Sequence, residues 1–428
     1  MPSSRFSHSL SRRSLLALGG TCTAVGGLAG YGFGAGVLRD DSCTTTPLDS
    51  SPLDWPLPNY DGANTRTAPP QSAPTPPLTE RWAISPNASS ATELIVTNGS
   101  VFVPGAAGSQ LLESYNVLTG KHEWTRRGLP HPRDLTLLSG GDFLFIPQAS
   151  GEDGVVSRAV ATSDGSPRWS TDMHATPVDA ALAAGHLCLP KGSDMLGFDA
   201  ATGEACWQQT FGGLPRVRAA TAGELLVTNA TGTDGELTVL DAETGQVTQS
   251  ANVSSHFHPD DDINDGLRNR IVIGDERWFV HTFSGRLLAL TVESGAIDWV
   301  EQSSQPNVIE EDGNVYAPAQ LSPVAISGET LLVFEEFVTD DPDVLYALDA
   351  TTGETKWTVE DAAKSLQPPA VAGNTVFVPM GGKLHLVDLV EGDRTDTYDV
   401  AGRPTSVALA GGFCVVSTTE ELLAFESA

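Results

Sequence analysis

A short phrase recurs seven times along the chain and limits the folds open to it more than any other feature. In its clearest form, at residues 345–360, an apolar run is followed by an Asp, a turn ending in Thr-Gly, and a polar run with one Trp. The pattern is A-x-D-x-x-T-G-x-x-x-W. Successive turn glycines are 38 to 58 residues apart, a period typical of repeats built from small sheets. These glycines are Gly120, Gly165, Gly203, Gly245, Gly295, Gly353 and Gly392.

Each copy has the character of a β-hairpin. A β-branched or leucine-rich run precedes the glycine turn and an alternating run follows it. Further strand pairs are expected between the turns, for example at residues 322–336 and 368–380. Each unit should therefore hold four strands. Four-stranded units of this period are typical of a β-propeller, in which closure of the ring protects the sheet edges.

The number of blades follows from the two ends of the chain. The seven hairpins join third and fourth strands, whereas residues 405–427 supply three more strands with no fourth. Residues 79–85 carry Trp82 in the repeat frame, 42 residues before Trp124, with no hairpin ahead of it. We expect this strand to pair with residues 422–425. The sequence thus predicts an all-β, eight-bladed β-propeller over residues 79–428, with the last blade closed by N- and C-terminal strands.

The repeated residues are expected to be structural. A tight hairpin needs a residue that tolerates positive φ, which accounts for the glycines. A Trp can bury both faces between neighbouring blades while its N–H finds an acceptor. The tryptophans in this slot are Trp82, Trp124, Trp169, Trp207, Trp299 and Trp357, which leaves only Trp55 and Trp278 elsewhere.

The N-terminus predicts export. Arg12 and Arg13 precede an uncharged run to Leu38, which resembles a twin-arginine signal over residues 1–38. The run is long enough to span a bilayer if it is retained, so cleavage and membrane anchoring both stay open. A lipid-modified Cys22 is disfavoured because Thr21 precedes it. Residues 39–78, rich in Ser, Thr, Pro and Asp, are expected to form a solvated linker and lead-in segment.

The repeat resembles that of the quinoprotein-type propellers, which include pyrroloquinoline quinone (PQQ) dehydrogenases and BamB-like outer-membrane assembly lipoproteins. Residues 55–69 also resemble the W-x(5)-D-x-x-N-T lead-in of such proteins. The resemblance implies the fold but leaves the activity open. For a PQQ enzyme it would imply adjacent cysteines, a calcium ion held by a carboxylate and an amide, a catalytic Asp and a longer chain. No two cysteines are adjacent here.

The cysteines in the repeats are expected to be small buried apolar residues. Cys188, Cys206 and Cys414 are scattered over separate strands. A Cys188–Cys206 disulfide is the weaker alternative, because second and fourth strands of a blade are not neighbours. No nucleophile elbow, phosphate-binding loop or H-E-x-x-H motif occurs, so nothing in the sequence favours an enzyme.

Charge indicates the environment. The chain has 54 acidic and 24 basic residues and a net charge of −30. Only five of the basic residues are Lys. Such a surface resembles proteins of halophilic archaea, where salt screens self-repulsion. It excludes nucleic acid as a partner, since phosphate contacts need clustered Lys and Arg. A halophilic archaeon has no outer membrane, so only the mode of action would carry over from BamB: a rigid ring that offers one face to other proteins.

Three long acidic loops, at residues 254–269, 303–320 and 335–343, are expected on one face, where insertions in repeat proteins often bind. Asp260, Asp262, Asn264 and Asp265 provide oxygens for a calcium site, but Gly266 and Ile271 break the EF-hand pattern. The alternative is that these loops are merely solvated. The other residues of the candidate partner face are Asp261, Glu310, Glu311, Asp312, Asp340 and Asp341.

We therefore expect a non-enzymatic binding or scaffold protein that needs no cofactor. Its partners would be unidentified proteins at the cell envelope, with membrane contact only through the N-terminal segment, and a closed ring of strong negative charge favours a monomer. The alternatives are a PQQ-dependent dehydrogenase with PQQ and calcium, and a calcium-dependent sensor or adhesion domain.

Overall fold

The computed structural model describes residues 38–39, 43, 45, 48, 50–86, 94–104, 111–128, 137–146, 157–171, 179–258, 265–305, 309–311, 314–316, 319–338, 340–361 and 366–428. By its internal contacts the chain divides into Met1–Gly34 and Ala35–Ala428. All described residues belong to the second unit. None of them belongs to a helix with the length and apolar character needed to cross a bilayer.

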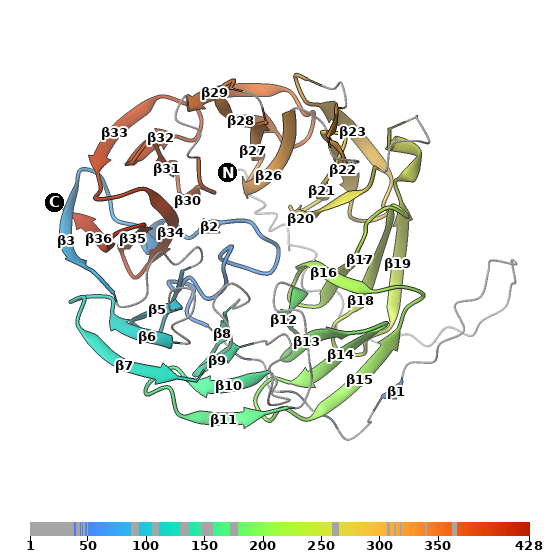
Figure 1. Ribbon diagram of the computed structural model, residues 1–428, viewed down its shortest axis with the longest axis horizontal. Helices are drawn as coiled ribbons and strands as arrows, with labels where there is room; N and C mark the ends of the chain where they lie inside the picture. Colours follow the sequence, from blue (N-terminus) through green and yellow to red (C-terminus); the bar gives the residue numbers. More distant parts are fainter. Residues whose placement is uncertain are drawn as a thin grey trace, which may run out of the picture. The chain divides into compact units, whose positions relative to one another are not determined.

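Eight four-stranded sheets form a ring, which confirms the predicted propeller (Figure 1). In each of the first four blades, consecutive strands pair antiparallel from the channel outward. Blade 1 holds β4 (Ile95–Thr97), β5 (Ser100–Pro104), β6 (Leu111–Asn116) and β7 (His122–Arg127). Blade 2 holds β8 (Leu138–Gly140), β9 (Phe143–Ile146), β10 (Arg158–Ala161) and β11 (Pro167–Ser170). Blade 3 holds β12 (Ala181–Ala183), β13 (His186–Lys191), β14 (Asp194–Asp199) and β15 (Ala205–Thr210). Blade 4 holds β16 (Pro215–Ala220), β17 (Glu224–Asn229), β18 (Glu236–Asp241) and β19 (Val247–Asn252).

The remaining blades follow the same plan. Blade 5 holds β20 (Leu267–Ile273), β21 (Arg277–Thr282), β22 (Arg286–Thr291) and β23 (Ile297–Gln302). Blade 6 holds β26 (Ala319–Ser327), β27 (Thr330–Phe337), β28 (Asp343–Asp349) and β29 (Thr355–Asp361). Blade 7 holds β30 (Ala370–Ala372), β31 (Thr375–Met380), β32 (Lys383–Asp388) and β33 (Arg394–Asp399). Blade 8 holds β34 (Pro404–Ala410), β35 (Phe413–Thr418), β36 (Leu422–Ser427) and β3 (Leu78–Ile84).

Blade 8 joins the two ends of the chain, as predicted. Strand β3 pairs antiparallel with β36, from Leu78 opposite Ser427 to Ile84 opposite Leu422. The ring is thereby closed by hydrogen bonds between residues near the start and the end of the propeller. Because the ring is closed, every blade has a neighbouring blade on both sides.

A few elements stand outside the repeat. Strand β1 (Leu38–Arg39) pairs with the outer edge of β15, and β2 (Thr67–Ala68) pairs parallel with the inner edge of β30. A hairpin of β24 (Ile309–Glu311) and β25 (Asn314–Tyr316) lies between blades 5 and 6 in sequence. Two 3₁₀ turns, η2 (Pro70–Ser72) and η5 (Ser254–His256), complete the described elements.

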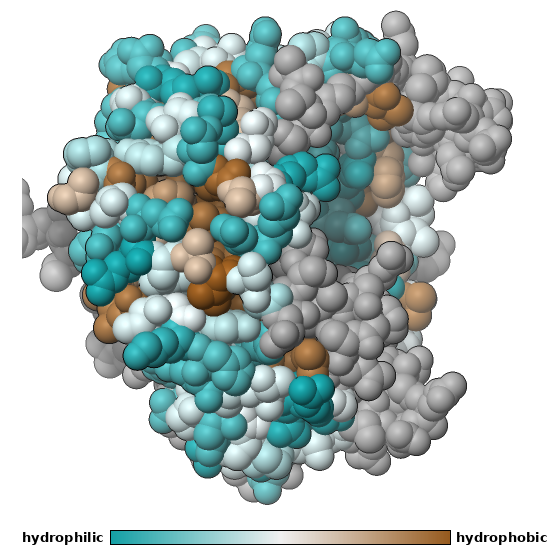
Figure 2. Space-filling model, turned by 60° about the vertical axis from the view of Figure 1, so that its left-hand side comes forward, coloured by the Kyte–Doolittle hydropathy of each residue, from teal (hydrophilic) through white to brown (hydrophobic). Residues whose placement is uncertain are grey.

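The hydrophobic core lies between the faces of neighbouring blades. One buried cluster joins Phe279 and Leu287 of blade 5 to Leu331 and Val333 of blade 6. Outermost strands instead alternate between exposed and half-buried residues, as in Ile297–Gln302. Figure 2 shows one flank of the molecule, where hydrophilic residues predominate and apolar residues gather in a narrow band.

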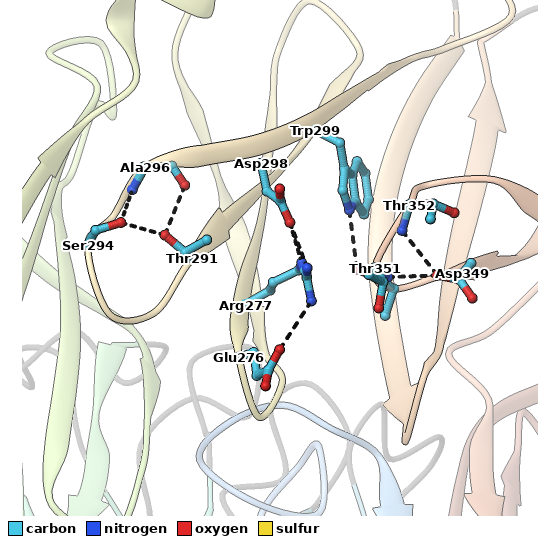
Figure 3. Close-up of polar contacts among 11 residues, drawn as sticks. Glu276, Arg277, Thr291, Ser294, Ala296, Asp298, Trp299, Asp349, Thr351 and Thr352 are labelled. Atoms are coloured by element: carbon cyan, nitrogen blue, oxygen red, sulfur yellow. Dashed lines mark hydrogen bonds and ion pairs between the residues drawn. The ribbon is translucent and has the colours of Figure 1, made fainter.

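The slot tryptophans join adjacent blades, which confirms their predicted packing. Each indole N–H donates to a backbone carbonyl of the following blade, at 2.9 to 3.2 Å. Figure 3 shows Trp299 reaching toward the turn that contains Asp349, Thr351 and Thr352; its acceptor is the carbonyl of Ala350. The Asp349 carboxylate fixes that turn by accepting from the N–H groups of Thr351 and Thr352.

The turn glycines have two reasons to be glycine. All seven have φ between +65° and +80°, a region that L side chains rarely adopt. Six of them also face a slot Trp of the preceding blade, and a Cβ on Gly245 would lie 2.4 Å from the Trp207 ring. The exception is Gly295, which faces Gln249 and Ala251 because the slot before it holds Gln.

The cysteines follow the prediction in two cases out of three. Cys188 and Cys414 are buried free thiols. Cys206, predicted to be a buried apolar residue, instead forms a disulfide with Cys43. The prediction was wrong because partners were sought only within the blades, whereas the N-terminal segment runs along blade 3 and brings Cys43 to β15.

Candidate partner-binding face and central channel

A non-repeating stretch, residues 53–72, crosses the central channel and is called the lead-in segment below. Figure 1 shows the part that carries β2 in the middle of the ring. We expected a solvated linker here, but Trp55, Ala68 and Ser72 are buried. The composition misled because its Ser, Thr and Pro residues suggested a solvated chain, whereas the backbone of this segment binds the blades.

The lead-in segment binds six blades at the open edge of the innermost strand, and it binds blade 8 at Gly412, in the turn between β34 and β35. Innermost strands have N–H groups with no further strand to pair with, and each such buried donor needs an acceptor. Carbonyls of the lead-in segment provide them at 2.6 to 3.0 Å. The acceptor and donor pairs are Trp55 and Val96, Pro56 and Ser139, Gly62 and Ala220, Ala63 and Ile273, Thr65 and Ile326, Arg66 and Val371, and Ser72 and Gly412. Blade 3 is held from further upstream, where Thr45 donates to the Ala184 carbonyl.

Arg66 is the centre of this arrangement. Its guanidinium, almost fully buried, donates to the carbonyls of Pro368 and Pro369 before blade 7 and of Val407 in blade 8. It also donates to Pro58 and Asn59 within the lead-in segment. The residue has φ of +50°, a conformation that these contacts hold in place. One side chain thus ties the lead-in segment to the two blades at the joint of the ring.

The polar residues of the lead-in pattern are also used structurally. Asn64 donates to the carbonyls of Arg218 in blade 4 and Ile271 in blade 5. Asp61 accepts from the backbone N–H and hydroxyl of Thr65. Burial raises the pKa of Asp61, and the hydrogen bonds from Thr65 oppose that rise. These side chains are therefore committed to the fold.

A small cavity remains between the lead-in segment and the inner strands of blades 2 to 4. It measures about 140 Å³ and is lined mainly by short apolar side chains, with Asn59, Asp61, Asn64 and Arg218 as its polar groups. Pockets for drug-sized ligands usually measure about 300 Å³ or more. Trp55 and Trp278, the tryptophans outside the repeat slot, are both buried in apolar clusters. Neither of these tryptophans lines this cavity.

Beside this cavity, arginines of blade 4 form a charged network with Asp179, which precedes β12 of blade 3. Arg216 and Arg218 both pair with the buried carboxylate of Asp179. Burial raises the pKa of Asp179, and the two arginines oppose that rise. Arg268 lies over the Phe283 ring at 5.4 Å, and burial lowers the pKa of its guanidinium despite the attraction of Glu336. Arg216 and Arg268 lie near the starts of β16 and β20, and the lead-in segment binds Ala220 and Ile273 at the ends of these strands.

Two of the three predicted rim loops come together in the structure. The backbone N–H of Ser304 donates to the Glu335 carboxylate at 2.5 Å, and the Gln305 amide donates to Asp341 at 2.9 Å. Asp340 and Asp341 are exposed. Glu310 and Glu311 belong to β24, of which only the backbone is described. Asp260, Asp261, Asp262, Asn264 and Asp312 lie outside the described residues.

Glu335 is a rim residue that the sequence did not single out. It is buried and accepts from the Tyr346 hydroxyl at 2.8 Å as well as from Ser304. Burial raises the pKa of Tyr346, and the hydrogen bond to Glu335 adds to the rise. Glu335 therefore fixes one rim loop against another. Residues Thr330 to Glu335 of β27 are all buried, so no alternation along the strand marked this residue in the sequence.

Asp265, the described member of the predicted calcium set, is buried and accepts four hydrogen bonds. One oxygen accepts from the N–H groups of Gly266 and Ser284, and the other accepts from the His258 N–H and the Ser284 hydroxyl. The distances range from 2.6 to 2.9 Å. This carboxylate anchors the start of blade 5 to the turn between β21 and β22.

The ring of A-x-D-x-x-T-G-x-x-x-W blades defines a β-propeller of the quinoprotein-repeat class. Within that class, the family described as outer membrane protein assembly factor BamB matches residues 138–330 and 269–426. These matches cover more than half of the chain, which therefore belongs to that family. No curated protein matches the chain.

Solved structures share the fold at low sequence identity. BamB from Moraxella catarrhalis is 16% identical, with a TM-score of 0.54, over 82% of this chain and 97% of its own. Quinohemoprotein alcohol dehydrogenase from Comamonas testosteroni is 12% identical, with a TM-score of 0.61, over 88% of this chain and 81% of its own. A europium-containing methanol dehydrogenase is 13% identical, with a TM-score of 0.60, over 89% of this chain and 99% of its own. These likenesses concern the fold alone.

Proposed function

We propose that this chain is an exported, envelope-associated propeller that binds other proteins and performs no reaction of its own. The observation that carries the proposal is the lead-in segment across the channel. It accepts hydrogen bonds from inner N–H groups of most blades, and the cavity beside it among the described residues measures about 140 Å³. A scaffold role is also that of the BamB proteins to which the chain is related.

The partner face in this proposal is formed by the loops that enter blade 6 and connect its second and third strands. Those loops are fixed to each other through Glu335 and Asp341, so they present a preformed surface. Val338 is 56% exposed beside the exposed Asp340 and Asp341, an apolar residue within an acidic rim. Such a surface suits a partner segment with basic residues around an apolar anchor.

Site-specific photo-crosslinking in the native host tests this proposal, with a photoreactive amino acid at Val338. The matched control is Val390, which is 61% exposed beside the exposed Glu391. It lies in a turn after the third strand of its blade and hence on the opposite face. We expect adducts with one or a few envelope proteins, identified by mass spectrometry, from position 338 and none from 390. Adducts from 390 alone, or none from either position, would contradict the proposed face.

The same cells test the predicted export. Accessibility of the chain to an added protease in intact, cell-wall-free cells is expected for the wild type. Replacement of Arg12 and Arg13 by Lys should retain the protein inside. Equal protection of the wild type and this variant would contradict export through a twin-arginine signal.

A further inference from the structure

Three potential metal ligands meet at blade 3. They are the sulfur atoms of Cys43 and Cys206 and a ring nitrogen of His186, and all three atoms lie within 4.8 Å of one another. It is the one group of three such ligands found among the described residues. Cys206 and His186 are buried, whereas Cys43 is partly exposed.

The blade positions two of these ligands through an irregularity in its sheet. His186 begins β13 and Cys206 lies in β15, and β14 pairs with both strands. The register between β14 and β15 shifts at Cys206: Gly197 opposes Trp207 and Phe198 opposes Ala205. A bulge of this kind redirects a side chain. It allows Cys206 to share a site with His186.

The N-terminal segment delivers the third ligand. Strand β1 pairs with β15, with Leu38 opposite Gln208 and Arg39 opposite Trp207. Downstream, Thr45 donates to the Ala184 carbonyl at 3.1 Å, next to the start of β13. Cys43 is therefore held between two contacts with the same blade. Its position does not depend on the disulfide alone.

We propose that Cys43, Cys206 and His186 form a redox-gated zinc site. In the oxidised protein the two sulfurs are joined as a disulfide. A dithiol reductant supplies two electrons and two protons, so that the S–S bond breaks and two thiols form while the reductant becomes a disulfide. Binding of Zn²⁺ then displaces both thiol protons, and the ion takes two thiolates and one imidazole nitrogen.

The ligand set determines the choice of metal. Thiolate sulfur with imidazole nitrogen is a preferred combination for Zn²⁺, whose ligand distances are about 2.3 Å to sulfur and about 2.0 Å to nitrogen. After reduction the two sulfurs, joined in the disulfide, must move apart to about 3.8 Å, the separation of two thiolates on a tetrahedral zinc, while the His186 nitrogen already lies within 4.8 Å of both. The exposed side of Cys43 leaves the fourth tetrahedral position to water.

The site can attach the segment around Cys43 to blade 3 in two ways. The disulfide holds residue 43 when conditions are oxidising, and zinc would hold it when they are reducing. Only the reduced, metal-free protein would lose this attachment. The inference concerns the N-terminal segment and stands independently of the partner face on blade 6.

Cobalt(II) is the probe, because it replaces zinc and its thiolate complexes absorb in the near ultraviolet and visible. The full chain is reduced with dithiothreitol, freed of reductant under argon, and titrated with CoCl₂ and then ZnCl₂. We expect one equivalent of Co²⁺ to give a thiolate charge-transfer band that Zn²⁺ abolishes. The oxidised protein should give no band.

Variants assign the ligands. Cys43→Ser and Cys206→Ser should lose the band and His186→Gln should weaken it, whereas Cys188→Ser and Cys414→Ser should keep it. Circular dichroism checks folding, and Cys43→Ser decides the matter if a buried variant fails to fold, since Cys43 is partly exposed. Absence of a band in the reduced wild type, or an unchanged band in Cys43→Ser, would overturn the proposal.

Discussion

The guanidinium carbon of Arg66 lies 5.3 Å from the centroid of the Trp55 ring. Trp55 exchanges two backbone hydrogen bonds with Val96 in blade 1, while Arg66 binds carbonyls at blades 7 and 8. The pair therefore connects the blades on both sides of the joint where the ring closes. Its contribution combines a cation–π contact with charge-assisted hydrogen bonds at a largely buried side chain.

Replacement of Arg66 should be among the most destabilising single changes in the chain. Arg66→Ala removes the guanidinium donor from five carbonyl or amide oxygens, and we expect a loss of at least about 3 kcal/mol in the free energy of unfolding. Arg66→Lys should recover less than half, because an ammonium cannot reproduce the planar fork. The control is Arg81→Ala at an exposed ion pair with Glu426, with an expected loss below about 1 kcal/mol. Urea unfolding at fixed salt measures both; similar losses for Arg66→Ala and Arg81→Ala would refute the role of Arg66.

The contact between turn glycine and slot Trp can be separated from backbone strain. Gly245→Ala and Gly328→Ala both place a Cβ at positive φ, with φ of +70° and +55°. Only the first meets an obstacle, at 2.4 Å in Trp207, whereas nothing lies within 4 Å of the second. We expect a loss of about 1 kcal/mol for Gly328→Ala from backbone strain. Gly245→Ala should lose about 2 kcal/mol more from overpacking. Equal losses for the two variants in thermal or urea unfolding would show that the Trp207 ring can move aside for the added methyl group.

His281 should make stability depend on pH. Burial lowers its pKa to about 3, and the charges of Arg268 and Arg270 contribute. In the unfolded chain the pKa is about 6.5, so at lower pH the unfolded state binds a proton that the folded state refuses. The contribution of His281 is fully present above about pH 6.5. It is lost on acidification, at about 1.4 kcal/mol per pH unit, until about pH 3.

The variant His281→Asn isolates this effect. Between pH 7 and pH 5 the wild type should lose about 2 kcal/mol more unfolding free energy than the variant. Burial also lowers the pKa of His385, to about 4, so His385 contributes a loss of stability in the same direction. Because His385 is present in both proteins, its contribution cancels in the comparison. Parallel pH profiles for the two proteins would mean that His281 becomes protonated without unfolding.

Asp265 distinguishes a structural carboxylate from a calcium ligand. Asp265→Asn turns an acceptor into a donor that faces N–H or O–H groups, so we expect a loss of about 2 kcal/mol. The loss should be the same with calcium and with a chelator at fixed ionic strength. Asp340→Asn, at an exposed position, serves as the control and should change little. A calcium-dependent stabilisation present in the wild type and absent in Asp265→Asn would identify Asp265 as a ligand instead.

The blade count could be predicted because it rests on local chemistry repeated in sequence. Each Asp-x-x-Thr-Gly turn forms from its own neighbours, and Trp82 marked the one fourth strand without a hairpin. The lead-in pattern of residues 55–69 was recognised, but the path of the segment across the channel could not be predicted. The segment binds the blades largely through backbone carbonyls, such as those of Gly62 and Ala63, which any residue possesses.

The remaining errors share that origin. The pairing of Cys43 with Cys206 joins residues 163 apart, and it depends on the short strand β1, whose two residues carry no recognisable pattern. Glu335 was one of many acidic residues in a chain of net charge −30, so its burial could not be distinguished by composition. Contacts between residues far apart in sequence, such as Cys43 with Cys206, could be identified only from the folded structure.

The joint in blade 8 also sets a condition on the timing of folding. Arg81 in β3 pairs with Glu426, 345 residues later, so the first strand of the propeller has no partner until the last has been made. Contacts of such sequence separation form slowly. A nascent chain that has completed seven blades still exposes the free edges of β3 and β35. Synthesis of β36, and not the folding of any single blade, is therefore the event that turns an aggregation-prone intermediate into a closed ring.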